Sequence, residues 1–257
     1  MKKIYLVAIM MLTATFANAQ QRVFLNSYSG TNLEKYDNQE CVVSISRYVF
    51  TGWNTLVLPF AVSESELNEA FGSDCRLERL VGAEQTAGGI TLNFMDCKAE
   101  GLSAGVPYIL YYSGESASKN LKKTALISKA QNDLSFVAGG VTVTMFGANL
   151  KQDAAGAYGV LVKDNAEAQF VNTDDVKGGF YATRCGVRLS NGNISQLYTR
   201  HLAAGEVTAI SEIGRASEKV EVYNLSGQRI AANIRIADIK NLPAAIYVVK
   251  GRKVIVK

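Results

Sequence analysis

The sequence predicts an all-β protein with a β-sandwich-like main domain, one short helix and a small C-terminal β-sandwich-like module. Short runs of Val, Ile, Thr and Tyr alternate with polar residues, which is the period of half-buried strands. The 22 glycines far outnumber the three prolines and fall between these runs, where they favour tight turns. One segment of the chain has both the start and the stop signals of a helix.

The first 19 residues have the three parts of a cleavable export signal. Two lysines (Lys2-Lys3) precede the apolar run Ile4–Leu12, and Ala17-Asn18-Ala19 has the small-x-small pattern of a cleavage site. We therefore expect cleavage between Ala19 and Gln20. The apolar run is too short to cross about 30 Å of hydrocarbon as a membrane anchor, and no later run is long enough. Export predicts a secreted or outer-surface location, with the periplasm as the alternative.

The charge of the chain gives no reason to expect nucleic acid as a partner. There are 27 basic and 23 acidic side chains, and two of the basic ones belong to the export signal. The mature chain thus carries a net charge of about +2 and shows no basic stripe along the sequence.

The main domain, residues 20–203, is predicted to be a series of short strands. Glu40–Phe50 and Trp53–Phe60 are separated only by Thr51-Gly52, which predicts a tight hairpin. Many short strands with turns at close intervals favour a sandwich or a barrel. The further strands are expected at Val106–Tyr112, Thr124–Ser128, Leu134–Phe146, Tyr158–Lys163, Ala168–Asn172, Gly179–Leu189 and Asn193–Arg200. Within Leu134–Phe146, Gly139-Gly140 is expected to form a bend or a turn.

The helix is predicted to begin at a capping box. Ser63 and Glu66 have the spacing in which the two side chains reciprocally bind free backbone N–H groups. Leu67 and Phe71 supply an apolar side, and Gly72 ends the helix.

Two of the four cysteines lie on the arms of a predicted hairpin, Cys75–Val81 and Ile90–Cys97. If the hairpin is symmetric about Thr86, Cys75 lies opposite Cys97, at a separation that suits a disulfide. The alternative is that both are small buried apolar residues, since a register slip of one residue removes the pairing. The cysteine spacings match no zinc or redox motif, and we expect no metal or cofactor.

A small polar stretch, residues 204–218, is interpreted as a linker before the C-terminal module, 219–257. The module has two predicted hairpins and is small for an independent core, so we expect it to lean on the main domain. Its residues follow the pattern V-x-V-Y-x-x-x-G and then L-x-x-x-x-Y before a final Lys. The matching positions are Val220, Val222, Tyr223, Gly227, Leu242, Tyr247 and Lys257.

On these residues the module resembles the type A C-terminal sorting domain of the type IX secretion (Por) system. The family pattern has Gly where this chain has Ala245, and the family's upstream Pro-Asn-Pro is absent. The resemblance implies a Gram-negative bacterial protein whose module contacts the outer-membrane secretion machinery. Trp53–Phe60 (W-N-T-L-V-L-P-F) and Ala104–Leu110 are similar to strands of adhesin-like surface β-domains that often precede such tails.

Catalytic chemistry has few candidate residues in this sequence. His201 is the one histidine, so a Ser-His-Asp triad would depend on it, but no G-x-S-x-G motif accompanies it. We interpret it as an exposed histidine at a strand end. Glycoside hydrolysis needs two carboxylates about 5–9 Å apart. Glu64/Glu66 and Asp174-Asp175 are the visible pairs, but Glu66 serves the cap and adjacent acids on a strand face opposite ways.

Two further groups of residues are candidate ligand sites. Asp164, Glu167, Asp174 and Asp175 could hold a calcium ion, but no D-x-D-x-D-G loop is present and a solvated turn is preferred. An aromatic platform for a sugar or a protein could be formed by Tyr48, Trp53, Tyr108, Tyr111 and Tyr112, and the ones we single out are Trp53, Tyr108 and Tyr112.

The function expected from the sequence is therefore a secreted or cell-surface module, not an enzyme, that binds, adheres or assembles. Its expected partners are a glycan or a host or surface protein. The first alternative is a carbohydrate-binding accessory of glycan utilisation, which an exposed aromatic pair over a shallow groove would favour. The second alternative is a carboxylate-dependent hydrolase, which requires two acids facing each other in a cleft.

Overall fold

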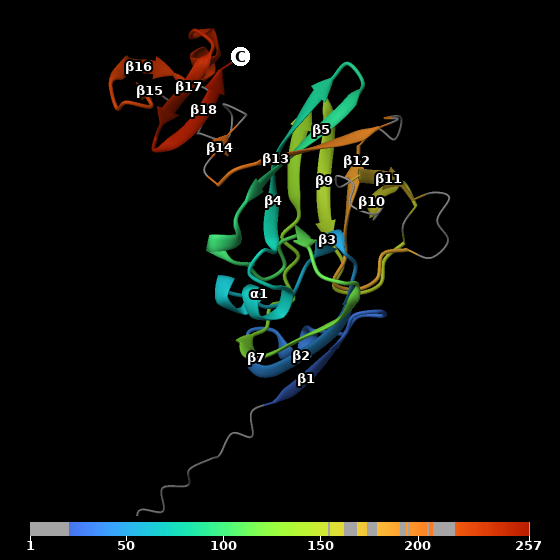
Figure 1. The fold of residues 1–257 in the computed structure, drawn as a ribbon. Coiled ribbons are helices and arrows are strands. Elements are labelled where there is room, and N and C mark those ends of the chain that lie inside the picture. Colours follow the sequence, from blue (N-terminus) through green and yellow to red (C-terminus); the bar gives the residue numbers. More distant parts are fainter. Residues whose placement is uncertain are drawn as a thin grey trace, which may run out of the picture.

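The structure is a computed structural model that describes residues 21–153, 155–161, 169–173, 179–190, 194, 196–204, 206–207 and 219–256. The predicted export signal with its Ala19–Gln20 cleavage site, the acidic residues Asp164, Glu167, Asp174 and Asp175, and Lys257 lie outside the described residues. The prediction of an all-β fold is confirmed, since the described residues form three sheets and a single α-helix (Figure 1). No helix within these ranges is long and apolar enough to span a membrane.

The N-terminal sheet has three strands: β1 (Arg22–Asn26), β2 (Glu40–Val49) and β7 (Ala117–Leu126). β1 lies parallel to β2, and β7 pairs antiparallel with the other side of β2. Every second residue of β2 is buried, so one face of this sheet packs on the core and the other meets solvent.

The large sheet curls back on itself. Its edge strand β3 contacts β10 and β12, and β4 contacts β8 near the opposite edge. Strand β13 pairs with β5 in parallel and with β11 antiparallel. In spatial order the strands are β3 (Gly52–Leu56), β6 (Tyr108–Tyr112), β4 (Arg76–Thr86), β5 (Gly89–Asp96), β13 (Leu197–Leu202), β11 (Gln169–Asn172), β10 (Ala157–Leu161), β12 (Cys185–Leu189), β9 (Val141–Gly147) and β8 (Leu134–Ala138).

The predicted hairpin at Thr51-Gly52 is wrong, because β2 and β3 belong to different sheets. Gly52 has a φ of +94°, a conformation that glycine adopts easily, and it turns the chain sharply between the two sheets. The buried amide of Asn54 takes the place of hairpin backbone bonds. Its Nδ2 donates to the carbonyl oxygens of Phe50 (2.8 Å) and Gly52 (3.0 Å), and its Oδ1 accepts from Phe50 N.

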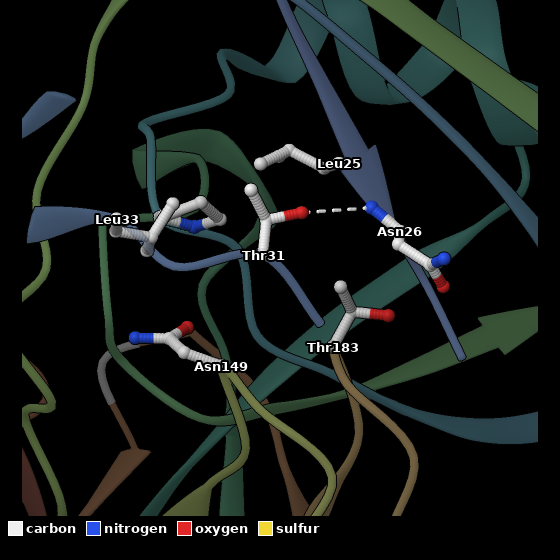
Figure 2. A pocket seen from close by; sticks show the side chains of 7 residues that line it. Leu25, Asn26, Thr31, Leu33, Asn149 and Thr183 are labelled. Atoms are coloured by element: carbon white, nitrogen blue, oxygen red, sulfur yellow. Dashed lines mark hydrogen bonds between the residues drawn. The ribbon is translucent and has the colours of Figure 1, made fainter. Parts of the chain in front are cut away.

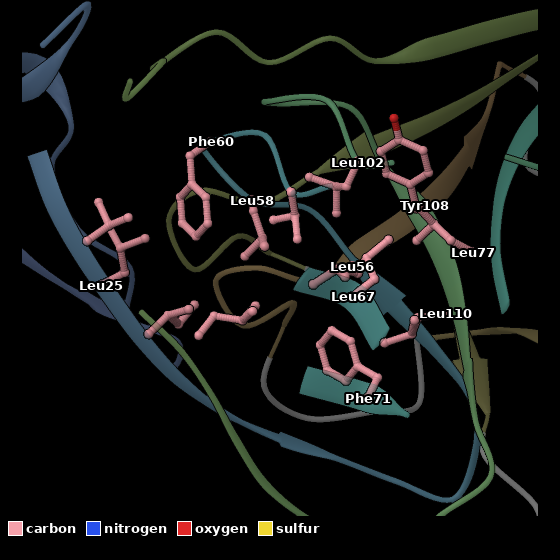
Figure 3. Close-up of a cluster of buried hydrophobic side chains, with 14 of the residues drawn as sticks. Leu25, Leu56, Leu58, Phe60, Leu67, Phe71, Leu77, Leu102, Tyr108 and Leu110 are labelled. Atoms are coloured by element: carbon pink, nitrogen blue, oxygen red, sulfur yellow. The ribbon is translucent and has the colours of Figure 1, made fainter. Parts of the chain in front are cut away.

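The predicted helix is confirmed as α1 (Glu64–Phe71), with its capping box. Ser63 N donates to the Glu66 carboxylate at 2.8 Å, and Glu66 N donates to Ser63 Oγ at 3.4 Å. Leu67 and Phe71 are buried and lie between the N-terminal sheet and the large sheet, in the first core of the main domain (Figure 3).

A second core fills the inside of the curled sheet. It holds apolar side chains from strands on both sides of the curl, among them Leu92, Phe94, Val143, Met145 and Phe170. The rings of Phe94 and Phe170 are parallel, with centroids 5.9 Å apart. The strands β3, β6 and β4 separate the two cores, so both of their faces are covered.

The predicted Cys75–Cys97 disulfide is wrong. The β4–β5 turn is tighter than predicted, with Thr86 opposite Gly89, and the register shifts between Leu80 and Gly82. Cys97 N therefore donates to Leu77 O at 2.9 Å, which places Cys97 opposite Leu77. All four cysteines are free and buried, as the alternative interpretation expected.

The C-terminal sheet has a core of its own, in which Val220, Val222 and Tyr247 are buried with Ile236 and Ile239. Its first strand lies within residues 204–218, which the sequence assigned to a linker. The residues of the sorting-domain pattern that the structure describes thus include three of the core side chains. In spatial order its strands are β14 (Glu206–Val207), β18 (Arg252–Val256), β17 (Ala245–Val249), β15 (Lys219–Asn224) and β16 (Arg229–Arg235). The 3₁₀ segments of the described chain are η1 (Glu34–Tyr36), η2 (Lys98–Glu100) and η4 (Ile236–Asn241).

Candidate binding site

The aromatic residues singled out from the sequence do not form an exposed platform. Trp53, Tyr108 and Tyr112 are 4%, 1% and 6% exposed. Tyr108 and Tyr112 face the first core, and Trp53 faces the second, together with Tyr111. The platform fails because β3 and β6 are covered on both faces, which alternation along one strand does not reveal.

His201 is not the exposed strand-end residue that the sequence suggested. Its Nδ1 lies 2.5 Å from an Oε of Glu78, a buried carboxylate, and its ring stacks on Trp53 with centroids 4.5 Å apart. The other ring nitrogen, Nε2, is buried and has no hydrogen-bond partner among the described residues. A hydrolytic triad places a nucleophile at that second nitrogen.

The acidic pair that the structure describes is not arranged for hydrolysis. Glu66 binds Ser63 and also forms an ion pair with Lys123 at 2.6 Å, whereas Glu64 is exposed on the first turn of α1. In the described part of the chain, no three His, Cys, Asp or Glu side chains gather where they could hold a metal ion.

Four exposed aromatic residues form a group that we call the aromatic rim: Tyr28, Tyr48, Phe50 and Tyr181. They form two pairs. The rings of Tyr28 and Tyr181 stack with centroids 4.3 Å apart, and those of Tyr48 and Phe50 meet edge to face at 5.1 Å. All four side chains are between 38% and 58% exposed. Half-exposed rings in pairs leave faces open for a ligand.

One ring of each pair, Phe50 and Tyr181, lines a cavity of about 430 Å³, which we call the apolar cavity. Its polar side chains are already engaged within the chain: Thr173 Oγ1 donates to Ala157 O, Thr55 Oγ1 accepts from Cys185 N, and Asn54 holds the β2–β3 corner. The lining residues are Phe50, Asn54, Thr55, Gly159, Val160, Val171, Thr173, Gly179, Phe180, Tyr181, Arg184 and Cys185.

Cys185 is the one thiol in this lining, and it is not an activated nucleophile. Burial raises its pKa to about 12. A thiol attacks as the thiolate, which is scarce at neutral pH when the pKa is so high. The cavity thus offers shape and apolar surface, and Arg184 is the one charged residue among the described residues that line it.

Arg184 and Lys151 are the two cations at the rim. The Arg184 guanidinium lies 5.9 Å from the centre of the Phe50 ring and donates to Tyr48 O at 3.0 Å. The Lys151 ammonium lies 5.4 Å and 5.5 Å from the ring centres of Tyr28 and Tyr181. Neither cation forms an ion pair with a carboxylate in the part of the chain that the structure describes.

The segment that carries Arg184 is held in place by Arg47, a buried residue of β2. Its Nη1 and Nη2 donate to Thr183 O and Thr55 O, each at 2.8 Å. Thr183 has a φ of +67°, which is unfavourable for a β-branched residue and needs such support. Burial lowers the pKa of Arg47, and repulsion from Arg184 lowers it further.

Thr183 also borders a small cavity of about 10 Å³, which Leu25, Asn26 and Thr31 line as well (Figure 2). There Thr31 Oγ1 accepts a hydrogen bond from Asn26 N at 3.0 Å. The space holds at most about one water molecule, so we assign it no ligand.

A second large cavity, of about 370 Å³, is lined by Lys151 together with mostly polar residues, and we call it the polar cavity. Within the described ranges, the side-chain amides of two of its lining residues, Gln131 and Asn149, have no hydrogen-bond partner. Lys129 at its edge is neutralised by Glu34 at 2.7 Å. Gln152 lines the polar cavity and Phe180 lines the apolar cavity, and an antiparallel backbone bridge joins these two residues.

Sequence reasoning named Tyr48 but missed the other three members of the aromatic rim, because the rim comes together only in the folded chain. Tyr28 and Tyr181 are brought together by the hydrogen bond from Ala182 N to Tyr28 O and by the bridge at Phe180. Neither residue lies in a regular strand, so no alternation marks its face.

Comparison with known proteins adds no relative to this description. No protein-family model matches the chain, and neither a curated protein nor a solved structure matches it. The resemblances to a sorting domain and to adhesin-like domains stay predictions from the sequence.

Proposed function

We propose that this chain is a secreted or cell-surface binding module without enzymatic activity, and that its ligand occupies the apolar cavity and the aromatic rim. The observation that carries the proposal is a cavity of about 430 Å³ lined by Phe50 and Tyr181, each of which is paired with a second exposed ring, Tyr48 and Tyr28 respectively. Ligand sites are commonly apolar and aromatic cavities of this size with few polar groups.

The chemistry around the cavity supports binding more than catalysis. The Cys185 thiol is protonated at neutral pH, and Nε2 of the Glu78–His201 pair has no neighbouring nucleophile among the described residues. The rim instead offers open aromatic faces, which contribute large contact areas with little loss of side-chain entropy.

One observation supports the carbohydrate-binding alternative. An exposed aromatic pair over a shallow groove was its expected mark, and the stacked pair of Tyr28 and Tyr181 beside the polar cavity has this form. Its residues differ from those singled out in the sequence.

The experiment that tests the proposal is an array of glycans and extracellular matrix proteins, probed with the chain lacking its predicted export signal, Gln20–Lys257. The variant is Phe50→Ala with Tyr181→Ala. The matched control is Tyr198→Ala, which removes a tyrosine of similar exposure, 40%, on β13. Circular dichroism and urea unfolding establish that each protein is folded.

We expect at least one bound ligand that the rim variant loses and the control retains. If the rim variant keeps every ligand of the unsubstituted chain, the assignment of the site is wrong. If the folded chain binds nothing, the binding proposal is wrong. If it releases reducing ends from the glycans, the binding proposal is also wrong and the hydrolase alternative is supported.

A further inference from the structure

We propose that the ligand of the aromatic rim is an acidic polysaccharide chain, with uronate carboxylates at Arg184 and Lys151 and sugar rings on the exposed tyrosines. This inference rests on the proposed function and adds the class of ligand. It follows from three features: two cations without a carboxylate partner among the described residues, the exposed rings of the rim, and two side-chain amides in the neighbouring cavity without a hydrogen-bond partner among the same residues.

The charge of the ligand follows from the cations. Arg184 and Lys151 lack carboxylate partners in the described part of the chain. Glu34, which also lines the polar cavity, is paired with Lys129, and Glu84 and Glu221 pair with cations elsewhere. Arg47, 3% exposed, lies behind Arg184 and adds positive charge that its carbonyl partners do not neutralise. Arg184 is partly buried, and a charge in such a position is normally paired. An anion from outside the chain therefore fits at Arg184, and the exposed Lys151 adds a second positive charge nearby.

The spacing of the cations suits a ligand with repeated charge. Arg184 and Lys151 flank Tyr181: Arg184 N donates to Tyr181 O, and the Lys151 ammonium lies 5.5 Å from the Tyr181 ring. Arg184 lines the apolar cavity and Lys151 lines the polar one. One ligand that crosses the ridge of Tyr28 and Tyr181 can therefore meet both cations.

The sugar component follows from the rings and the amides. The faces of half-exposed tyrosines accept the C–H face of a sugar ring, and Gln131 and Asn149 offer donors and acceptors to hydroxyl groups. An acidic peptide could match the cations but has no need of several open rings beside unpaired amides, so we prefer the polysaccharide.

The test measures binding of polygalacturonate and of hyaluronan, two unsulfated uronate polymers of different origin, by affinity electrophoresis and calorimetry with Gln20–Lys257. Methyl-esterified polygalacturonate is the matched neutral ligand. The variants are Lys151→Gln and Arg184→Gln, with Arg184→Lys to restore the charge. Lys219→Gln is the control, because it removes one positive charge on the C-terminal sheet.

We expect binding of at least one acidic polymer, at least about tenfold weaker for the ester and for each of Lys151→Gln and Arg184→Gln, as lost charged hydrogen bonds predict. Arg184→Lys should recover part of the affinity, and Lys219→Gln should bind as the unsubstituted chain does. Binding should weaken as salt rises. The polymer that binds identifies the source.

Equal binding of the ester and the acid, or full affinity of Lys151→Gln, would overturn the inference. So would the absence of uronate binding when the array reveals another ligand that needs Phe50 and Tyr181; the proposed function would then stand. If substituting those aromatic residues changes no binding at all, the proposed function fails as well.

Discussion

Arg47 on β2 donates a hydrogen bond of 2.8 Å to the carbonyl oxygen of Thr183, which lies 136 positions further along the chain. A second bond of 2.8 Å joins the same guanidinium to Thr55 O on β3. One buried side chain thus connects the N-terminal sheet, the edge of the large sheet and the segment that carries Arg184.

Replacing Arg47 by Ala should destabilise the protein by about 3 kcal/mol. The substitution removes two charge-assisted hydrogen bonds and leaves a cavity in a buried region. Urea unfolding followed by circular dichroism measures the change, with the exposed Arg22→Ala as the control. Equal midpoints for the two variants would show that Arg47 does not hold these elements together.

Removing the helix cap should have a smaller effect. Ser63→Ala deletes the hydroxyl that accepts from Glu66 N, and we expect a loss of about 1 kcal/mol of unfolding free energy. Glu69→Ala, on the exposed side of α1, is the control and should change stability by less than about 0.5 kcal/mol. A loss no larger than that of the control would contradict the role of the capping box.

The same cap should make stability depend on pH in the acid range. Burial opposes the ionisation of Glu66, but hydrogen bonds from Lys123 and Ser63 outweigh it and lower its pKa below the ordinary 4.5. A lowered pKa stabilises the folded state fully above about pH 4.5, and this contribution is lost as pH falls through the folded-state pKa. Glu66→Gln should reduce the slope of stability against pH below 4.5, and an unchanged slope would refute this assignment.

The four thiols should be protected and unbridged in the native protein. Burial raises the pKa of Cys97 and Cys185 to about 12 and also raises the pKa of Cys41 and Cys75. We expect negligible labelling by iodoacetamide at pH 8 without denaturant and four labelled thiols in urea without reductant. Two unlabelled thiols under the second condition would demonstrate a disulfide and contradict the observed register.

The Glu78–His201 pair should be coupled energetically. His201→Ala leaves the Glu78 carboxylate buried without its partner, which should cost about 2 kcal/mol. Adding Glu78→Gln should restore part of this loss, because a neutral amide is less costly to bury. Trp53 is the one tryptophan and stacks on His201, so its fluorescence reports the local change. A double variant that is no more stable than His201→Ala would exclude the coupling.

Local signals in the sequence predicted the elements whose stabilising contacts lie close in the chain. The capping box of Ser63 and Glu66 needs residues three positions apart, and it is present. The break of Leu134–Phe146 at Gly139-Gly140 is the turn between β8 and β9, because both glycines adopt a positive φ. The alternation of β2 likewise predicted its buried face.

Predictions that depended on which strands pair, and in which register, failed for a physical reason. The Cys75–Cys97 register depends on the turn and on the shift between Leu80 and Gly82, and one misplaced residue changes every opposite pair. The hairpin after β2 failed because the Asn54 side chain satisfies the corner without strand pairing. The N-terminal strand β1 was not predicted, and it is held by parallel pairing with β2.

The sequence by itself determined that this chain is built of short strands with one capped helix, because alternation, turns and caps act over a few residues. Only the tertiary structure decided which aromatic residues are exposed and which cations lie without a carboxylate partner in the described part of the chain. Trp53 and Tyr108 are covered because two cores meet across β3 and β6, whereas Tyr28 and Tyr181 form an open pair through contacts between distant segments. Burial of a side chain depends on what packs over it, and that is set by the whole fold.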